Sequence, residues 1–218
     1  PGRYGGFTFY PGMPYAHKYA NAVGELGIMG TLKKFAPGSI IGTMFRGAKA
    51  GITQDVHGLM KMLVDAEMKR FRGCRTPVIF LQNVVTDLLL GFEMYEMFRA
   101  FHDYCRSKYG AEAGFFTMNM PKLVDVLHGE GIENPIICAN INKIGFRMCP
   151  DVDTYIETLQ KKQFRPIAMS IFASGAIPPA EAIEWVCGLP KLEAIVFGAS
   201  SKQNIQNTRE LVEKHWRF

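Results

Sequence analysis

Two groups of polar residues follow apolar segments directly, and both have side chains suited to binding an anion. In the first, residues 198–205, Gly198 permits close backbone approach, Ser200 or Ser201 can cap a helix, and Lys202 falls in the first helical turn. Acidic residues usually occupy that turn, so a lysine there beside free helix N–H groups predicts a phosphate site. A plain strand-to-helix turn with a serine cap is the alternative. Asn204 belongs to the same candidate site.

The second group follows the apolar run 136–139 and has the densest polar character of any strand end in the sequence. Asn140, Asn142 and Arg147 are the candidate substrate-binding residues, and Lys143 lies between them. A lysine that points inward past apolar neighbours has a lowered pKa and can form a Schiff base with a carbonyl substrate. A solvated loop lysine is the alternative for Lys143.

Further polar residues end other apolar runs: Asn83, Asn119 and Ser170. Asp87, four residues after Asn83, is read either as a helix N-cap or as a site residue. His17 follows the turn 10–14 and has a pKa range suited to proton transfer, although an exposed first-turn histidine is equally ordinary. We find no cluster of His, Asp and Glu at these ends, so we expect no metal.

Short apolar runs alternate with longer amphipathic runs along the whole chain, which predicts repeated strand-helix units. Several strands are apolar on consecutive residues, as parallel strands covered by helices on both faces are. The predicted strands are 6–10, 39–44, 77–82, 114–118, 135–141, 166–171 and 193–197. The predicted helices include 54–71, 122–127, 151–160 and 180–186, and the helix after Asp87 has a broad apolar face from Leu88 to Tyr104.

Repeated units of this kind form either a doubly wound sheet or a barrel. We find no Gly-rich dinucleotide loop after an early strand, and the best phosphate loop follows the last strand, where barrels often bind phosphate. The fold class we expect is α/β, a (β/α)8 barrel forming one domain over residues 1–218, with its first strand preceding Pro1.

Composition limits the classes of function. The chain has 218 residues, of which 48% are hydrophobic and 21% charged, and a net charge of +5. We expect a soluble cytoplasmic protein with no membrane span and with five reduced cysteines. Its basic residues are scattered, so we expect no nucleic acid partner and favour a small anionic substrate. Homo-oligomer formation stays open.

From about Gly51 onward, the order of segments resembles the aldo-keto reductase superfamily. The stretches that carry the resemblance are Val78 to Asn83, Gly114 to Asn119, Pro166 to Gly175 and Gly198 to Ile205. The last two are the most specific: one is similar to the family's strand ending near Ser-Pro-Leu-x-x-Gly, the other to its cofactor-phosphate turn. The resemblance implies a barrel and the cofactor NADP(H), and the cofactor-binding residues that we expect are Asn119, Ser170, Gly198, Ser200, Ser201, Lys202 and Asn204.

The resemblance also implies catalytic positions, most of which this sequence does not match. The family's proton-donor tyrosine would correspond to Tyr15, and its histidine would fall on Asn83. The family's aspartate would fall on Tyr10 and its lysine on Met44, so the usual basis for polarising a carbonyl is missing.

Three functions remain open. The first is a divergent NADP(H)-type oxidoreductase acting on a small carbonyl or phosphorylated metabolite, with Tyr15 as proton donor. The second is a lyase or aldolase with Lys143 as the Schiff-base nucleophile. The third is a non-catalytic barrel with a binding or subunit-interface role, suggested by the apolar face after Asp87.

Overall fold

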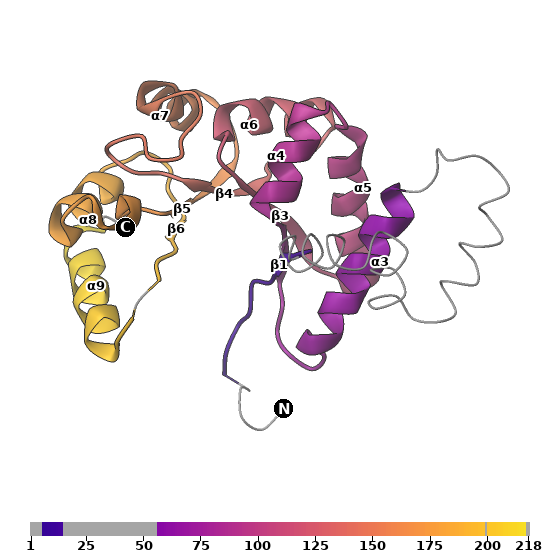
Figure 1. Cartoon of the computed structure of the whole chain (residues 1–218), viewed down its shortest axis with the longest axis horizontal. Helices are drawn as coiled ribbons and strands as arrows, with labels where there is room; N and C mark the ends of the chain where they lie inside the picture. Colours follow the sequence, from indigo (N-terminus) through magenta and orange to yellow (C-terminus); the bar gives the residue numbers. More distant parts are fainter. Residues whose placement is uncertain (1–5, 15–55, 199, 217–218) are drawn as a thin grey trace, which may run out of the picture. The chain divides into compact units, whose positions relative to one another are not determined.

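The computed structural model describes residues 6–14, 56–198 and 200–216 (Figure 1). Among the described residues, six strands lie in one sheet in the order β1-β2-β3-β4-β5-β6, and the pairs β1–β2, β3–β4, β4–β5 and β5–β6 are parallel. The strands are β1 (Gly12–Met13), β2 (Val78–Leu81), β3 (Glu112–Thr117), β4 (Ile136–Asn140), β5 (Arg165–Met169) and β6 (Ala194–Ile195). Helices connect them, which confirms the predicted α/β class.

The strands form where consecutive apolar residues are bounded by proline or polar residues. Every residue of β2 and of β4 is buried, as expected of strands covered on both faces. β4 pairs with β5 along its whole length, from Ile136 opposite Arg165 to Asn140 opposite Met169. The carboxyl ends of these two neighbouring strands therefore lie at the same level.

The chain divides into two compact units, of which the first comprises Pro1–Val85 and Glu96–Ala113. Its helical elements are α3 (Val56–Met68), η1 (Lys69–Phe71), α5 (Glu96–Tyr104) and η2 (Cys105–Tyr109), a short π-helix. The Asp65 carboxylate on α3 accepts hydrogen bonds of 2.5 Å from the Tyr104 and Tyr109 hydroxyls and from the Lys108 ammonium. These bonds fasten α3 to the end of α5 and to η2.

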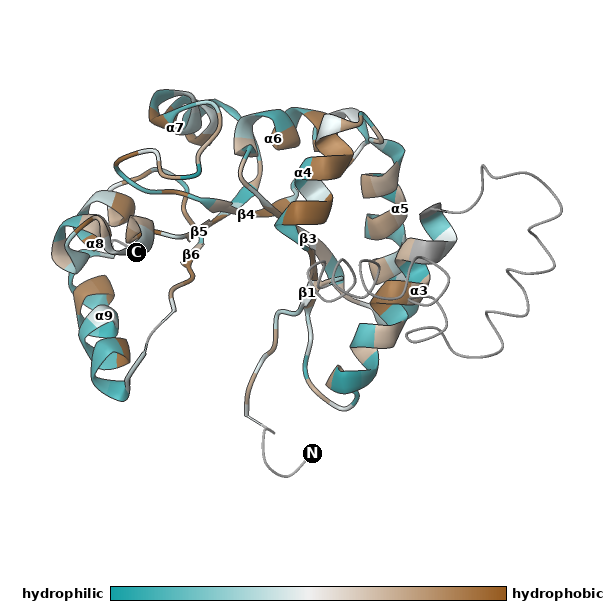
Figure 2. Ribbon diagram, viewed as in Figure 1, coloured by the Kyte–Doolittle hydropathy of each residue, from teal (hydrophilic) through white to brown (hydrophobic). Residues whose placement is uncertain are grey.

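The second unit comprises Thr86–Tyr95 and Gly114–Phe218. Its helices are α6 (Met120–Gly129), α7 (Val152–Lys161), α8 (Pro179–Cys187) and α9 (Lys202–His215), with a short η3 turn at Ala173–Gly175. Side-chain caps begin three of the helices: Asn119 accepts from Lys122 N, Asp151 from Thr154 N and Ser201 from Asn204 N. Figure 2 shows that α9 is mostly hydrophilic, and Thr208 is its buried residue.

The predicted helix after Asp87 is wrong as a single element. The structure has α4 (Asn83–Gly91) and then α5, separated at 92–95, where Glu93 adopts a φ of 57°. The broad apolar face is divided accordingly, because Phe98 and Phe101 are fully buried while Leu88 and Phe92 are exposed. Asp87 lies inside α4, so it is not an N-cap.

The other predicted elements differ mainly at their ends. The first strand lies at Gly12–Met13, whereas the predicted 6–10 contributes one bridge, between Thr8 and Arg75. The last strand is shorter than 193–197. The predicted strand 39–44 lies outside the described residues. Within the described ranges, the structure has no helix that combines the length and the apolar character needed to cross a membrane.

Candidate functional site

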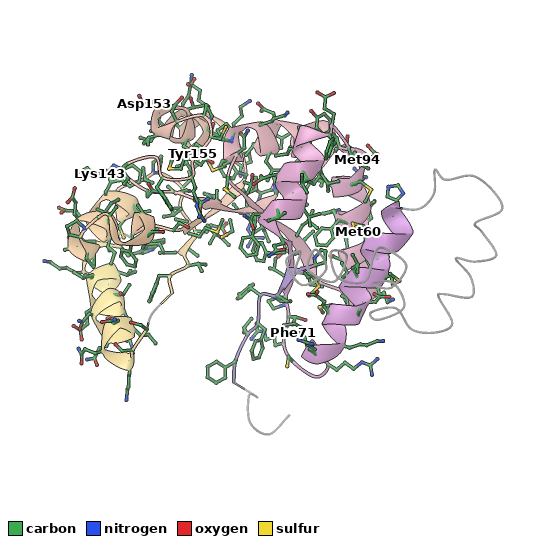
Figure 3. All side chains as sticks on the ribbon, in the orientation of Figure 1. Met60, Phe71, Met94, Lys143, Asp153 and Tyr155 are labelled. Atoms are coloured by element: carbon green, nitrogen blue, oxygen red, sulfur yellow. The ribbon has the colours of Figure 1, made fainter. Side chains whose placement is uncertain are left out.

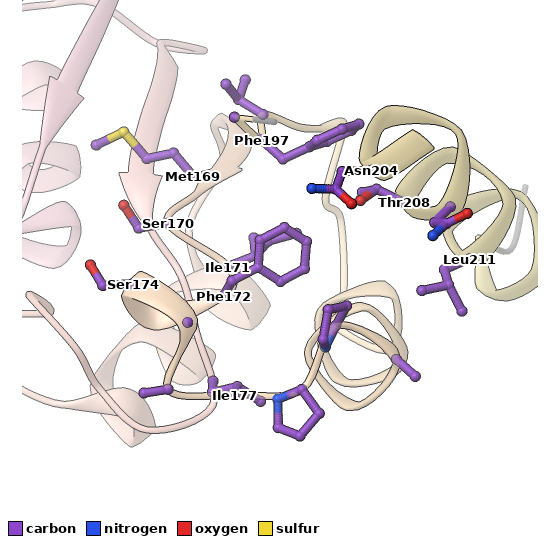
Figure 4. Close-up of a pocket in the computed structure, with 18 of the residues that line it drawn as sticks. Met169, Ser170, Ile171, Phe172, Ser174, Ile177, Phe197, Asn204, Thr208 and Leu211 are labelled. Carbon is purple, nitrogen blue, oxygen red and sulfur yellow. The ribbon is translucent and has the colours of Figure 1, made fainter. Parts of the chain in front are cut away.

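A cavity of about 1100 Å³ lies within the second unit, where β5 and β6 end. Its walls come from two stretches that are far apart in the sequence: residues 169–180, which follow β5, and residues 196–211, which follow β6 and enter α9. Figure 4 shows Phe172 near the middle of this cavity, with Phe197, Asn204 and Thr208 around it. Ligand pockets are typically several hundred to about 1,000 Å³, so the volume suffices for a cofactor-sized molecule.

The β5 wall is built on an unusual backbone turn. Ser170 has a φ of 55°, and Ala173, Ser174 and Gly175 follow with φ values of 46°, 58° and 91°. Each non-glycine residue in this left-handed region costs about 1–2 kcal/mol. Burial of Ala173 against Ile177 and Ala182 offsets part of that cost. Strain of this kind gathers at ligand sites, where the surrounding fold enforces it.

The α9 wall begins with two serines that both accept hydrogen bonds from Asn204. Ser201 Oγ accepts from Asn204 N at 3.1 Å, and the Asn204 side-chain amide donates to Ser200 Oγ at 3.0 Å. Asn204, Thr208 and Leu211 are spaced four and three residues apart, so they occupy one face of the helix, and all three line the cavity. The cap that the sequence predicts for Ser200 or Ser201 is thus formed by Ser201.

The chemistry of the lining is neutral. Among the described lining residues none is charged, and the polar groups are hydroxyls and amides beside the aromatic rings of Phe172 and Phe197. Lys202 is exposed at the first position of α9, two residues after the lining residue Ser200. This arrangement can accept an uncharged planar group inside the cavity and an anion at the helix start.

The asparagines of the predicted substrate group after β4 bond to backbone atoms of their own loop. Asn142 is buried, and its amide donates to Phe146 O at 2.9 Å while its carbonyl accepts from Phe146 N at 2.8 Å. The buried Asn140 amide donates to Arg147 O at 3.0 Å. Both asparagines therefore fasten the loop 142–148. The Arg147 guanidinium lies over the Phe146 ring, 5.2 Å from its centroid, on the exposed side of that loop.

Lys143 does not point inward past apolar neighbours. Its ammonium lies 2.7 Å from a Glu181 carboxylate oxygen, and its side chain is 46% exposed (Figure 3). This is a solvated ion pair, so Lys143 lacks the apolar surroundings that the Schiff-base hypothesis requires.

Asp87 forms a polar contact at the end of β3 that the sequence did not predict. Its carboxylate accepts from the Thr117 hydroxyl at 2.6 Å and from Met118 N at 3.1 Å. Burial raises the pKa of Asp87, and these two hydrogen bonds offset only part of the increase. Asn119, a predicted cofactor residue, caps α6, and its amide donates to the Cys149 sulfur at 3.7 Å.

The remaining predicted residues are placed as follows. Asn83 is the first residue of α4 and is half-buried. Tyr15 and His17 lie outside the described residues. In the part of the chain that the structure describes, His, Cys, Asp and Glu side chains form no group able to hold a metal ion.

Four of the predicted cofactor residues, Ser170, Gly198, Ser200 and Asn204, line this cavity, and Ser201 and Lys202 lie between two of them in the sequence. Sequence reasoning missed the aromatic residues Phe172 and Phe197. It also missed the helical face of α9, which was visible in the spacing of Asn204, Thr208 and Leu211. Comparison of the chain with protein-family models and with curated proteins finds no match.

Proposed function

We propose that this protein is a divergent NADP(H)-type oxidoreductase-like barrel that acts on a small carbonyl or phosphorylated metabolite. The observation that supports the proposal is the cavity itself. The segments around Ser170 and Ser200 are about 30 residues apart; by sequence, the first resembles the family's strand ending near Ser-Pro-Leu-x-x-Gly and the second its cofactor-phosphate turn. In the structure they form opposite walls of a single cavity.

Strand order supports the barrel over the doubly wound alternative. The described strands follow chain order from β1 to β6. A doubly wound sheet reverses direction at a switch point, as in the order 3-2-1-4-5-6, whereas a barrel adds each strand beside the preceding one. The site at the carboxyl ends of β5 and β6 is also where barrels usually bind their ligands.

The residues fit a dinucleotide. The rings of Phe172 and Phe197 suit an uncharged base, and the hydroxyls and amides suit ribose. The start of α9, with Ser201 as cap and Lys202 beside it, suits a phosphate group, because free N–H groups and a cation meet there. When bound, NADP(H) would supply or accept a hydride. The proton donor in this proposal is Tyr15, as the resemblance implies.

Titration of the whole chain with NADPH, followed by nicotinamide fluorescence, tests the proposal. We expect saturable binding at micromolar concentrations and about tenfold weaker binding in Lys202→Ala, which corresponds to about 1.4 kcal/mol. Lys214→Ala is the matched control, because it removes a lysine from the last turn of the same helix. Failure of NADPH to bind at several hundred micromolar would show that the proposal is wrong, as would equal weakening in both variants.

A subunit interface is the second candidate function, and it rests on Leu88 of α4 and on Phe92, the first residue after that helix. Leu88 and Phe92 lie four residues apart and are 53% and 72% exposed. Phe92 N donates to Leu88 O at 2.9 Å, so the two residues keep helical spacing, and exposed apolar side chains at this spacing are typical of a contact with another molecule. Light scattering after size-exclusion chromatography should show a dimer that Phe92→Glu converts to a monomer. A monomer at every concentration would argue against the interface.

A further inference from the structure

A short cationic turn in the first unit carries four positive charges in seven residues. The sequence from Lys69 to Arg75 is Lys-Arg-Phe-Arg-Gly-Cys-Arg and contains no acid. Arg72 has φ and ψ of −58° and 127°, Gly73 has a φ of 77°, and Cys74 N donates to Phe71 O at 3.0 Å. These values define a type II turn, in which the third position requires glycine. Arg72 is therefore presented at the tip of a tight turn.

Contacts with the amino-terminal segment hold this turn in place. The Phe71 ring, labelled in Figure 3, lies 6.1 Å from the Phe9 ring. Phe9 N donates to Arg75 O at 2.8 Å, and Thr8 forms a parallel bridge with Arg75. The turn is thus held at Phe71 and at Arg75.

The four cationic side chains, Lys69, Arg70, Arg72 and Arg75, are exposed. Among the described residues no carboxylate pairs with any of them, although other cations of this unit are paired: Lys108 with Asp65, and Arg99 with Asp103. Unpaired like charges held close together repel one another, so the turn gains stability from a polyanion.

Two exposed aromatic side chains lie on the segment that pairs with this turn. Phe7 is 65% exposed and Tyr10 is 56% exposed. Cations that follow a phosphate backbone, combined with aromatic rings on which bases stack, are the two components of sequence-tolerant binding to single-stranded nucleic acids. Three of the four cations are arginines, and the planar guanidinium group of arginine binds phosphate through two hydrogen bonds.

We propose that this surface, formed by Lys69, Arg70, Arg72, Arg75, Phe7 and Tyr10, binds single-stranded nucleic acid through its phosphodiester backbone. The proposal goes beyond the cofactor site and does not depend on it. It also departs from the expectation that the scattered basic residues of the chain exclude such a partner. An anionic membrane is the less suitable partner, because Arg72 and Arg75 follow the end of η1 and therefore do not extend the polar face of an amphipathic helix.

The test uses the whole chain and fluorescein-labelled 15-nucleotide oligouridylate and oligodeoxythymidylate, with binding followed by fluorescence anisotropy from 50 to 300 mM salt. The variant is the triple substitution Arg70→Ala, Arg72→Ala and Arg75→Ala. Its control is the triple substitution Arg99→Ala, Lys161→Ala and Lys162→Ala, which removes the same charge from residues that are paired to carboxylates. Circular dichroism checks that both variants are folded.

We expect the turn variant to weaken binding at least tenfold and to reduce the slope of log affinity against log salt by about 2, since each phosphate contact contributes about 0.7. We expect the control to change affinity by less than about threefold, and Phe7→Ala to weaken binding about fivefold through lost stacking. Equal losses in both triple variants would overturn the proposal, because net charge alone would explain them. Binding to phosphatidylserine vesicles without binding to either oligonucleotide would overturn it too.

Discussion

The Lys143 ammonium and the Glu181 carboxylate are 2.7 Å apart, and both side chains are almost half exposed. This ion pair joins the loop after β4 to the first turn of α8. An acid in the first turn is favourable for α8 itself, because it lies at the positive end of the helix. The lysine that the sequence offers as a nucleophile therefore serves as a surface partner of a helix start.

We predict that Lys143→Met changes the free energy of unfolding by less than about 1 kcal/mol, as solvent-exposed ion pairs contribute little. Urea denaturation measures this. Borohydride trapping with glycolaldehyde or pyruvate, read by mass spectrometry, should modify Lys143 no more than the exposed Lys161. A trapped adduct on Lys143 that is absent from Lys161 would support the Schiff-base hypothesis again.

We predict that the contact between Thr117 and Asp87 stabilises the fold in a pH-dependent way. The folded state holds the Asp87 proton to a higher pH than the ordinary value of 3.8. The contribution of Asp87 to the free energy of unfolding therefore falls as the pH rises from 3.8 through the raised pKa. Above the raised pKa this contribution is constant. Thr117→Val removes a hydrogen-bond donor that favours the ionised form of Asp87. The pKa of Asp87 therefore rises further in this variant, and the free energy of unfolding falls more steeply with pH.

At pH 7, Thr117→Val should cost about 1.5–3 kcal/mol, the range for a hydrogen bond to a charged group, and the cost should be smaller at pH 4. Thr158→Val is the matched control, because its buried hydroxyl donates to a neutral acceptor, Thr154 O. Its effect should be smaller and independent of pH. Urea denaturation of the unmodified protein and of both variants between pH 4 and 7 measures the free energy of unfolding. If it changed with pH in the same way in all three proteins, the prediction would be contradicted.

We predict that Asn142→Ala destabilises the protein by about 1–3 kcal/mol, because both the N–H and the carbonyl of Phe146 lose their partner. Asn134→Ala is the control at an exposed position, where a change of less than about 0.5 kcal/mol is expected. Denaturant unfolding measures both. If Asn142→Ala lowered the free energy of unfolding less than Asn134→Ala does, the loop 142–148 would have to rearrange when Asn142 is absent.

We predict that the cysteines react in the order of their exposure. Cys149 is exposed, whereas burial raises the pKa of Cys105 and of Cys138 to about 12. The thiolate is the reactive species, so iodoacetamide at pH 7.5 should modify Cys149 first and leave the two buried thiols intact until urea is added. Mass spectrometry of digested protein follows each site. Early modification of Cys138 would mean that β4 opens readily.

The order of strands and helices could be predicted from the sequence because its causes are local. Consecutive apolar residues form β2 and β4, and side chains such as Asp151 and Ser201 begin the helices that follow. The break between α4 and α5 was not predicted, since an apolar face continues across it and Glu93 gives no sign of its positive φ.

The candidate site could be predicted only in part. Ser170 and Ser200 could be proposed separately as ends of strands, yet only the pairing of β5 with β6 makes them walls of one cavity. The polar group after β4 shows the opposite outcome. Asn140 and Asn142 had the right residue types for a ligand site, but their amides bind backbone atoms of their own loop.

The sequence alone determined which residues form elements and which polar groups follow them, because periodicity, caps and turns act over a few residues. Only the tertiary structure decided which partner each polar group takes. The Lys143 ammonium can bond to a ligand or to a carboxylate, and its choice of Glu181 depends on a helix that lies 38 residues away in the chain. The type of residue sets which donors and acceptors a side chain carries, whereas the fold sets which partners they bond to.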